Sequence, residues 1–112
     1  AAAEARDWDR FARLLNPEVV YTLEQSRERI SGRDRYVAFN RDYPGDWHLT
    51  VELVVADDDA AFSRTGFAVG DQTQVGLTVF TFDSAGAIAT IDDFWPQAYD
   101  PPAGREHLVE RF

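Results

Sequence analysis

The second half of the chain is a succession of extended segments separated by short turns, and this feature constrains the fold most. From Trp47 to Val55 apolar side chains occupy every second position, which is the period of a half-buried strand. The same reasoning predicts further strands over residues 61–69, 73–82 and 87–95. The intervening turns are Asp57-Asp58-Asp59, Gly70-Asp71 and Asp83-Ser84-Ala85-Gly86. Long strands joined by turns this tight form an antiparallel meander.

A first helix is expected ahead of the meander. Apolar side chains recur at helical spacing from Ala5 to Leu15, and Asn16-Pro17 ends the pattern. The sequence opens at Ala1 without a Met, which suggests an N-terminal stretch before it. In that case the first helix would begin upstream of Ala1. A strand over residues 18–23 follows.

A second helix follows a polar, Arg-rich hairpin or edge strand over residues 25–31. Ser31 is the expected N-cap, and Asp34 in the first turn favours the positive end of the helix dipole. Pro44-Gly45-Asp46 ends the helix. Its apolar face carries Tyr36, Phe39, Asn40 and Tyr43.

These elements predict one α+β domain over residues 1–112, in which a curved antiparallel sheet wraps the N-terminal helices around one apolar pocket. The last segment, 96–112, is expected to be an extended arm because Pro101-Pro102 excludes helix there. Arg105 to Phe112 forms a short helix or a tail.

The late strands are apolar on both faces. Val75, Leu77 and Val79 lie on one face of the expected strand, and Phe80 and Phe82 lie on the other. A domain of this size needs only one face of its sheet for the core. The outer face therefore predicts a homodimer.

Charge and composition exclude several classes of protein. The formal net charge is −9, which makes nucleic acid a poor partner. No apolar run is long enough to cross a membrane, no signal-peptide pattern is present, and there is no Cys, so a reducing cytoplasm is the expected location. The basic residues between Arg27 and Arg41 are expected to pair with Glu28, Asp34 and Asp42, or else to attract an anionic ligand.

Motifs for cofactor, metal or nucleophile chemistry are missing. His48 and His107 are isolated, so no metal site is expected, and no Gly-rich phosphate loop occurs. No GxSxG motif is present either. The expected chemistry is therefore cofactor-independent.

Asp93 is the candidate catalytic residue. Asp92 and Asp93 are adjacent on the last strand, so their side chains point to opposite faces. Asp93 shares its face with Ile91 and Trp95, whose bulk predicts that this face is the interior. Desolvation there would make the carboxylate a useful general base. The alternative is a structural Asp, held by hydrogen bonds from a Trp N–H, a Tyr O–H or backbone amides.

Four amphipathic aromatic residues and one amide are the candidate ligand-binding residues: Tyr21, Tyr36, Trp47, Trp95 and Asn40. Each aromatic side chain buries a large face and keeps one polar tip, which suits a pocket for a small, largely apolar organic molecule. Taken singly, each aromatic side chain is more often an ordinary core residue than a ligand contact. Asn40 must find a hydrogen-bond partner whether it lines a pocket or is buried in the core.

The order of elements, with several local motifs, resembles the nuclear transport factor 2-like superfamily in its SnoaL-like, polyketide-cyclase-like branch. The residues that carry the resemblance are Ala5-Arg6-Asp7-Trp8-Asp9, Leu14-Leu15, Ser31-Gly32-Arg33, Phe39-Asn40-Arg41, Tyr43 to His48 and Ile91 to Pro96. The resemblance spans nearly the whole chain. It implies a cone-shaped fold with an internal pocket and a dimer through the outer sheet face, and it leaves the activity open.

Carry-over of site residues from this family is limited. The ketosteroid isomerase pattern would place a helix Tyr before Ala1, a base near Leu23 and an acid near Thr78. None of these groups is present, and Glu24 is one residue out of register. For the epoxide hydrolase pattern only Arg64 and Asp93 are available. The SnoaL-like cyclases place an Asp acid/base in the pocket, a part that Asp93 could play.

Two functions follow. In the first, Asp93 is the general acid/base of a cyclase or isomerase acting beside a carbonyl, and Tyr21 and Tyr36 donate hydrogen bonds to the oxyanion. Trp47 and Trp95 would pack the body of the substrate. In the second, the chain is a non-catalytic ligand-binding or dimerisation module of the same fold.

Overall fold

Two short helices accompany one six-stranded sheet in the computed structural model, which describes residues 1–112. In chain order the elements are α1 (Trp8–Arg13), β1 (Leu15–Leu23), β2 (Glu28–Ser31), α2 (Arg33–Arg41), β3 (Trp47–Ala56), β4 (Ala60–Val69), β5 (Gln72–Phe82) and β6 (Ile88–Phe94). The four strands of the meander are thus within one residue of the ranges that alternation predicts.

The sheet is mixed. Its strand order is β2-β1-β6-β5-β4-β3. The meander strands pair antiparallel, as expected. β1 and β6 pair in parallel, which no local pattern indicated. β2, α2 and the first three strands of the meander separate β1 from β6 along the chain. After this long connection β6 runs beside β1 in the same direction, so the two strands are parallel.

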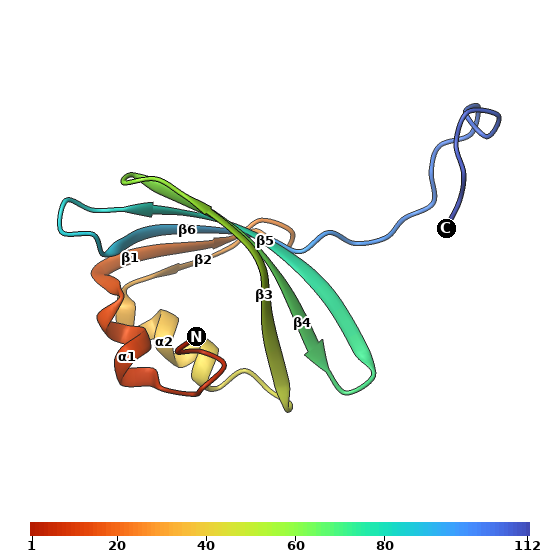
Figure 1. The fold of residues 1–112 in the computed structure, drawn as a ribbon. Helices are drawn as coiled ribbons and strands as arrows, with labels where there is room; N and C mark the ends of the chain where they lie inside the picture. Colours follow the sequence, from red (N-terminus) through yellow and green to blue (C-terminus); the bar gives the residue numbers. More distant parts are fainter.

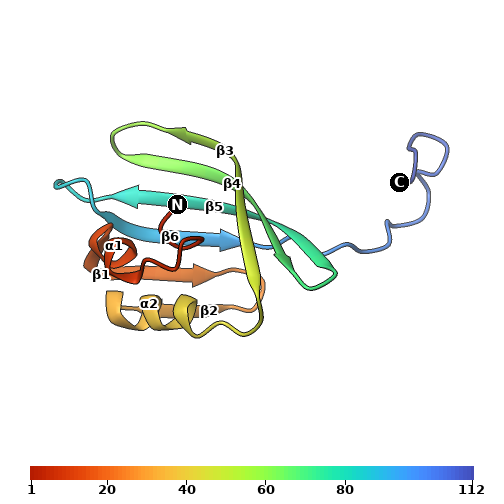
Figure 2. The same ribbon diagram turned by 60° about the horizontal axis from the view of Figure 1, so that its bottom comes forward.

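The sheet bends around the helices, which lie against its concave side (Figure 1). Figure 2 shows β3 and β4 curving out of the plane shared by β1, β6 and β5. A register shift between Val51 and Leu53 in β3 contributes to this bend, since a bulge increases local twist. The expected α+β fold, with a curved sheet wrapped around N-terminal helices, is confirmed.

The first helix is shorter than the apolar stripe predicts, and it begins at Trp8. Asp7 caps it by accepting a hydrogen bond from the Arg10 backbone N–H at 3.2 Å. Arg6, at φ 59°, breaks the helical path, and its guanidinium lies 3.6 Å from the centre of a Trp47 ring and donates to the Trp47 carbonyl. Pro17 lies inside β1, in the irregular stretch where the register with β6 shifts.

The prediction that Ser31 is the N-cap of the second helix is wrong. Ser31 is the last residue of β2 and pairs with Val20. Gly32 takes the N-cap position, without a side-chain hydrogen bond, at φ 100°. A glycine adopts this conformation readily, and the sharp turn it allows lets α2 fold back directly beneath the strand.

The core lies between the helices and the β1–β6 pair. Its buried residues are Leu15, Val19, Tyr21, Tyr36, Val37 and Ile91. The far part of β3 contributes no buried residue, and Val54 there is 58% exposed. The core therefore supports one half of the sheet, and a hollow remains under the other half.

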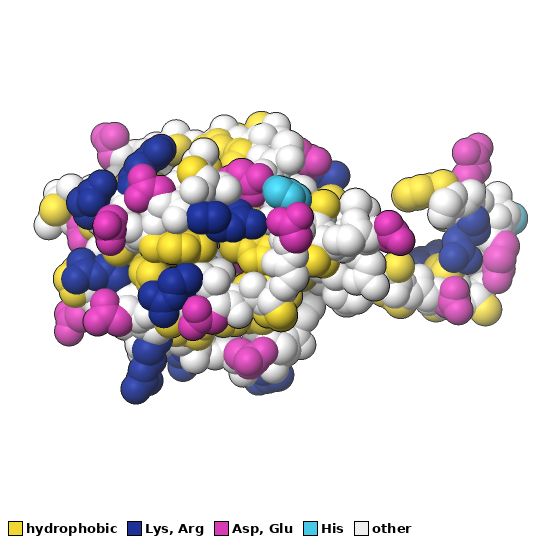
Figure 3. Space-filling model, turned by 90° about the horizontal axis from the view of Figure 1, so that it is seen from below, with side chains coloured by type: hydrophobic (Ala, Val, Ile, Leu, Met, Phe, Trp, Pro, Cys, Tyr) yellow, Lys and Arg dark blue, Asp and Glu magenta, His cyan; other side chains and the backbone are white.

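The surface charges pair less than expected. In the Arg-rich region Arg41 Nε lies 3.2 Å from Asp42 Oδ1, while Glu28 and Asp34 form no ion pair. Figure 3 shows acidic and basic side chains interspersed over the lower face. No helix has the length and apolar character needed to cross a membrane.

Candidate functional site

A cavity of about 370 Å³ lies between α2 and the concave face of the sheet. Its volume is within the range of small-molecule sites, about 300–1,000 Å³. Rings make up much of its wall: Tyr21, Tyr36, Phe39, Tyr43, Trp47, Phe67, Phe80 and Trp95 line it. Alternation along β1 and β3 to β6 turns most of these side chains inward, and α2 with the residues just after it supplies the others.

Asp93 projects into this cavity from β6 and is 8% exposed. Three donors hold its carboxylate. The Tyr21 hydroxyl donates to Oδ2 at 2.6 Å, and the Trp95 Nε1–H donates to the same oxygen at 3.1 Å. The Thr78 hydroxyl donates to Oδ1 at 2.7 Å. A carboxylate accepts about four hydrogen bonds, so one position on Oδ1 is left for a ligand.

Trp95 reaches Asp93 through a slot opened by Gly76 on β5. A Cβ built on Gly76 would lie 2.7 Å from Cη2 of Trp95 and 2.8 Å from Cζ2, closer than such atoms approach. The backbone of Trp95 is held in place as well, because its N–H donates to Gln25 Oε1 at 2.7 Å. Gly76 therefore sets the position of one of the three donors to the carboxylate.

Gly76→Ala is expected to displace the Trp95 indole and to lengthen or break its hydrogen bond to Asp93. Overpacking of this kind typically costs about 1–3 kcal/mol of stability. The indole N–H resonance of Trp95 in a ¹H–¹⁵N spectrum should shift upfield as the bond weakens. Gly66→Ala is the matched control on β4, since its added Cβ meets nothing closer than 3.4 Å. An unchanged Trp95 resonance in Gly76→Ala would show that the position of the Trp95 indole does not depend on the missing Cβ at residue 76.

The Tyr21 and Tyr36 rings pack against each other beside Asp93 in a tilted arrangement, with ring centres 4.8 Å apart. Burial raises the pKa of Tyr21 far above its usual range, and the neighbouring Asp93 charge adds to the effect. Burial and the Asp93 charge raise the pKa of Tyr36 in the same way. Both phenols therefore remain protonated hydrogen-bond donors at any physiological pH.

The raised pKa values of Tyr21 and Tyr36 make stability fall in alkali. An unfolded chain loses these two phenolic protons near pH 10, whereas the folded chain keeps them. Stability is thus fully present below about pH 10 and falls above it, by about 1.4 kcal/mol per pH unit for each tyrosine. Urea unfolding from pH 9 to 11 measures the slope, and Tyr36→Phe should reduce it by about half. An unchanged slope in that variant would contradict the assignment.

Asn40 and Trp47 also line the cavity. The Asn40 Nδ2–H₂ group donates to the Tyr36 carbonyl at 2.8 Å, one helical turn back, so its amide oxygen has no part in that bond. Trp47 is buried under Arg6, and its ring lies 6.4 Å from that of Phe67. Phe67 in turn contacts Trp95, with ring centres 5.6 Å apart. The structure thus brings all six predicted site residues to one cavity.

Other considered residues lie elsewhere. Arg64 faces away from the cavity, where its Nε lies 2.8 Å from Glu52 Oε2, so it cannot serve an epoxide hydrolase arrangement. His48 is exposed and pairs with Glu4 at 2.9 Å, and this hydrogen bond raises the pKa of His48. Leu23 and Thr78 line the cavity without an acidic group. No three His, Asp or Glu side chains come close enough together to hold a metal ion.

Sequence reasoning missed two supporting residues, Thr78 and Gly76. Thr78 stands directly opposite Asp93 in the β5–β6 register, and Gly76 lies two residues before it on the same face. Counting back from the turn at Asp83 could have placed Thr78 near the Asp92-Asp93 pair of β6, but not opposite Asp93 itself. The register shift between Thr81 and Phe82 would have made that count wrong by one residue.

Asp93 is the one residue with a charged side chain in the cavity wall. It is the single ionisable carboxylate among the lining residues, and no Arg or His lines the cavity. The remaining polar groups of the side chains are amides, hydroxyls and the indole N–H groups of Trp47 and Trp95. An anionic ligand would meet an uncompensated carboxylate in a desolvated site, so this wall suits a neutral ligand.

Comparison with known proteins gives one family and many similar structures. Residues 1–91 match the SnoaL-like domain. No curated protein matches the chain. A crystal structure from Kribbella flavida DSM 17836, provisionally described as a ketosteroid isomerase, is 45% identical, with a TM-score of 0.92 over 99% of this chain and 82% of that chain.

Two more distant structures share the fold alone. A steroid delta-isomerase from Pseudomonas aeruginosa is 18% identical, with a TM-score of 0.70 over 86% of this chain and 72% of that chain. An LEH-like epoxide hydrolase from M. tuberculosis is 22% identical, with a TM-score of 0.69 over 85% of this chain and 74% of that chain.

Proposed function

Because this chain belongs to the SnoaL-like domain family, we propose that its cavity binds a small, largely apolar organic molecule and that Asp93 acts on it as a general acid/base without a cofactor. One observation carries the proposal. The Asp93 carboxylate is held by three donors in a cavity walled by aromatic rings, with one acceptor position on Oδ1 left for a ligand.

The reaction we propose is proton transfer beside a carbonyl. Asp93 Oδ1 takes a proton from the carbon next to the carbonyl, and the electron pair of that C–H bond moves to the carbonyl oxygen to give an enolate. The Tyr36 hydroxyl, which is not bonded to Asp93, donates to that oxygen. Asp93 then returns the proton to another carbon, which completes an isomerisation. In a cyclase, the enolate carbon would attack a second carbonyl and Asp93 would protonate the new alkoxide.

Tyr21 has a different part from the one expected from sequence. Its hydroxyl proton is directed at Asp93 Oδ2, so it orients the carboxylate together with Trp95. Two donors on Oδ2 and one on Oδ1 leave Oδ1 as the oxygen with a free acceptor position. The similarity to the Kribbella flavida protein, provisionally described as a ketosteroid isomerase, supports proton transfer as the reaction type. The absence of an acid at Leu23 and Thr78 argues for a single-carboxylate mechanism.

A non-catalytic ligand-binding module is the second candidate, and the same hydrogen bonds favour it. A carboxylate that already accepts three hydrogen bonds is well satisfied, as a purely structural Asp would be. In that case the cavity still takes a neutral apolar ligand, and nothing happens to its C–H bonds.

The exchange of carbon-bound protons distinguishes the two candidates. The probe is 2-tetralone, a neutral, largely apolar ketone with acidic C–H bonds, incubated with the protein in D₂O and followed by ¹H NMR. Catalysis predicts exchange well above that in buffer with the same concentration of acetate. Saturable binding of 2-tetralone without accelerated exchange would support the non-catalytic module instead.

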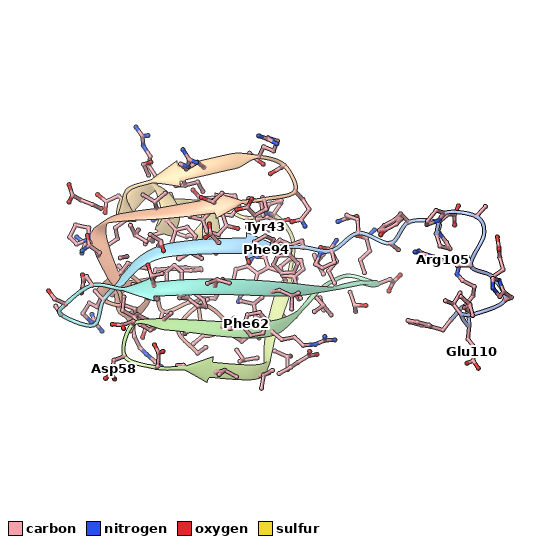
Figure 4. All side chains as sticks on the ribbon, turned by 90° about the horizontal axis from the view of Figure 1, so that it is seen from above. Tyr43, Asp58, Phe62, Phe94, Arg105 and Glu110 are labelled. Atoms are coloured by element: carbon pink, nitrogen blue, oxygen red, sulfur yellow. The ribbon has the colours of Figure 1, made fainter.

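We also propose a homodimer through the outer face of the sheet. Leu53, Val55 and Val79 are exposed on this face. Figure 4 looks onto it and labels Phe62 on β4 and Phe94 on β6, the strands on either side of β5. Burying such a patch favours self-association. Sedimentation should give a dimer for the wild type and a monomer for Val79→Glu. A monomeric wild type at high concentration would contradict this proposal.

A further inference from the structure

The chain beyond β6 leaves the body of the protein as a long arm, residues 96–112. Figures 1 and 2 show it running away from the sheet, and Figure 3 shows it joined to the body by a narrow neck. It contains turns but no helix or strand. The arm as a whole adds nothing to the core of its own domain.

The side chains of the arm are nevertheless apolar at several places. Tyr99 is 82% exposed and Leu108 is 75% exposed, and Val109 and Phe112 are exposed as well. Bulky apolar side chains gathered on one projecting segment mark a surface that is covered by a partner. Each one left in water forgoes the free energy that burial would provide.

The projecting course of the arm is not peculiar to this chain. The Kribbella flavida crystal structure superimposes with a TM-score of 0.92 over 99% of this chain. The arm is more than a tenth of the chain, so a score this high over that length requires the arm to follow a similar path in both proteins. An arm that made no contacts would not be expected to have the same conformation in two proteins.

A trough on the outer side of the sheet adjoins the base of the arm. It has a volume of about 810 Å³. Small residues on neighbouring strands line part of it, among them Thr50, Gly66, Ala68 and Thr73, and longer polar side chains line the rest, among them His48, Glu52 and Gln74. Pro96 to Ala98 form one of its walls. Small side chains let a foreign backbone approach closely, and the trough borders the apolar outer face.

We infer that the arm exchanges between two copies of this chain, so that the arm of each copy lies in the trough of the other; this inference rests on the homodimer proposed above. The two surfaces belong to one sequence and adjoin each other, so a twofold axis near the arm base would satisfy both reciprocally. The charges agree, because the arm carries three acids and two Arg, whereas the whole chain is at −9. A nearly neutral arm can approach an acidic body with little repulsion.

Isotope-resolved photo-crosslinking tests the exchange directly. Chains carrying Leu108→p-benzoylphenylalanine at natural abundance are mixed with ¹⁵N-labelled wild-type chains, irradiated, digested and analysed by mass spectrometry. Arm exchange predicts crosslinks between the unlabelled arm and ¹⁵N-labelled peptides from residues 48–75. The control is Arg13→p-benzoylphenylalanine, which is exposed on α1 and should give no crosslink to those peptides.

A second measurement uses a polar arm of unchanged length. The variant Tyr99→Ser/Leu108→Ser/Phe112→Ser should raise the dimer dissociation constant by about tenfold or more, because buried apolar side chains dominate such contacts. Its thermal unfolding as a monomer should be unchanged, since these residues lie outside the core. Crosslinks found only within one chain, no crosslinks at all, or an unchanged dissociation constant would overturn the inference.

Discussion

Asp93→Asn is expected to lower the rate of ketone proton exchange by about 10²–10⁴-fold, the usual contribution of a general base. The amide has nearly the shape of the carboxylate but cannot take a proton at the required position. Binding of 2-tetralone should stay within a few-fold of the wild type, because the aromatic wall is unchanged. NMR exchange rates and fluorescence titration measure the two quantities.

Asp92→Asn is the matched control for this change. It removes the same charge from the adjacent residue, whose side chain faces away from the cavity, so exchange should be unaffected. Asp93→Asn will also lose stability, by about 1–3 kcal/mol, since an amide cannot accept from all three donors. A folded Asp93→Asn protein with wild-type exchange would exclude Asp93 as the base.

Ile91→Ala is expected to destabilise the fold by about 2–5 kcal/mol, the range for truncating a buried Ile. Ile91 is 2% exposed and joins β6 to the core under the helices, and it also lines the cavity. Its loss would leave a void on the inner face of the β1–β6 pair, between the core and the cavity. Urea denaturation measures the change in the free energy of unfolding.

Val54→Ala is the comparison for Ile91→Ala. Val54 is a β-branched residue in the same sheet but is 58% exposed, so its truncation should change stability by no more than about 0.5 kcal/mol. Equal effects of the two variants would mean that the core is not concentrated between the helices and the β1–β6 pair.

The C-terminal half of the fold follows from the sequence because its signals are local. The period of two from Trp47 to Val55 and the acidic and Gly-containing turns fix both strands and connections. The parallel β1–β6 pair depends on contacts between residues far apart in the chain, and no local pattern encodes it. The N-terminal helix was overestimated because tertiary contacts of Arg6 with Trp47 override helical spacing.

The site was predictable in part for the same reason. Strand alternation is enough to turn Asp93 and Trp95 to one face and Asp92 to the other. The partners of Asp93 were not predictable, because Thr78 and Tyr21 reach it across strand pairings whose register is set by the assembled sheet. The slot at Gly76 likewise exists only once the Trp95 ring is in place.

The indole N–H resonances of the three Trp residues offer the most direct measurement of the cavity as a ligand site. Trp47 and Trp95 line the cavity, whereas Trp8 is not among the lining residues and packs against Phe11 and Trp47. Titration with 2-tetralone should shift the Trp95 and Trp47 resonances saturably and leave Trp8 nearly unmoved. Trp95 and Trp47 resonances that stay in place throughout the titration would contradict a ligand site at Asp93.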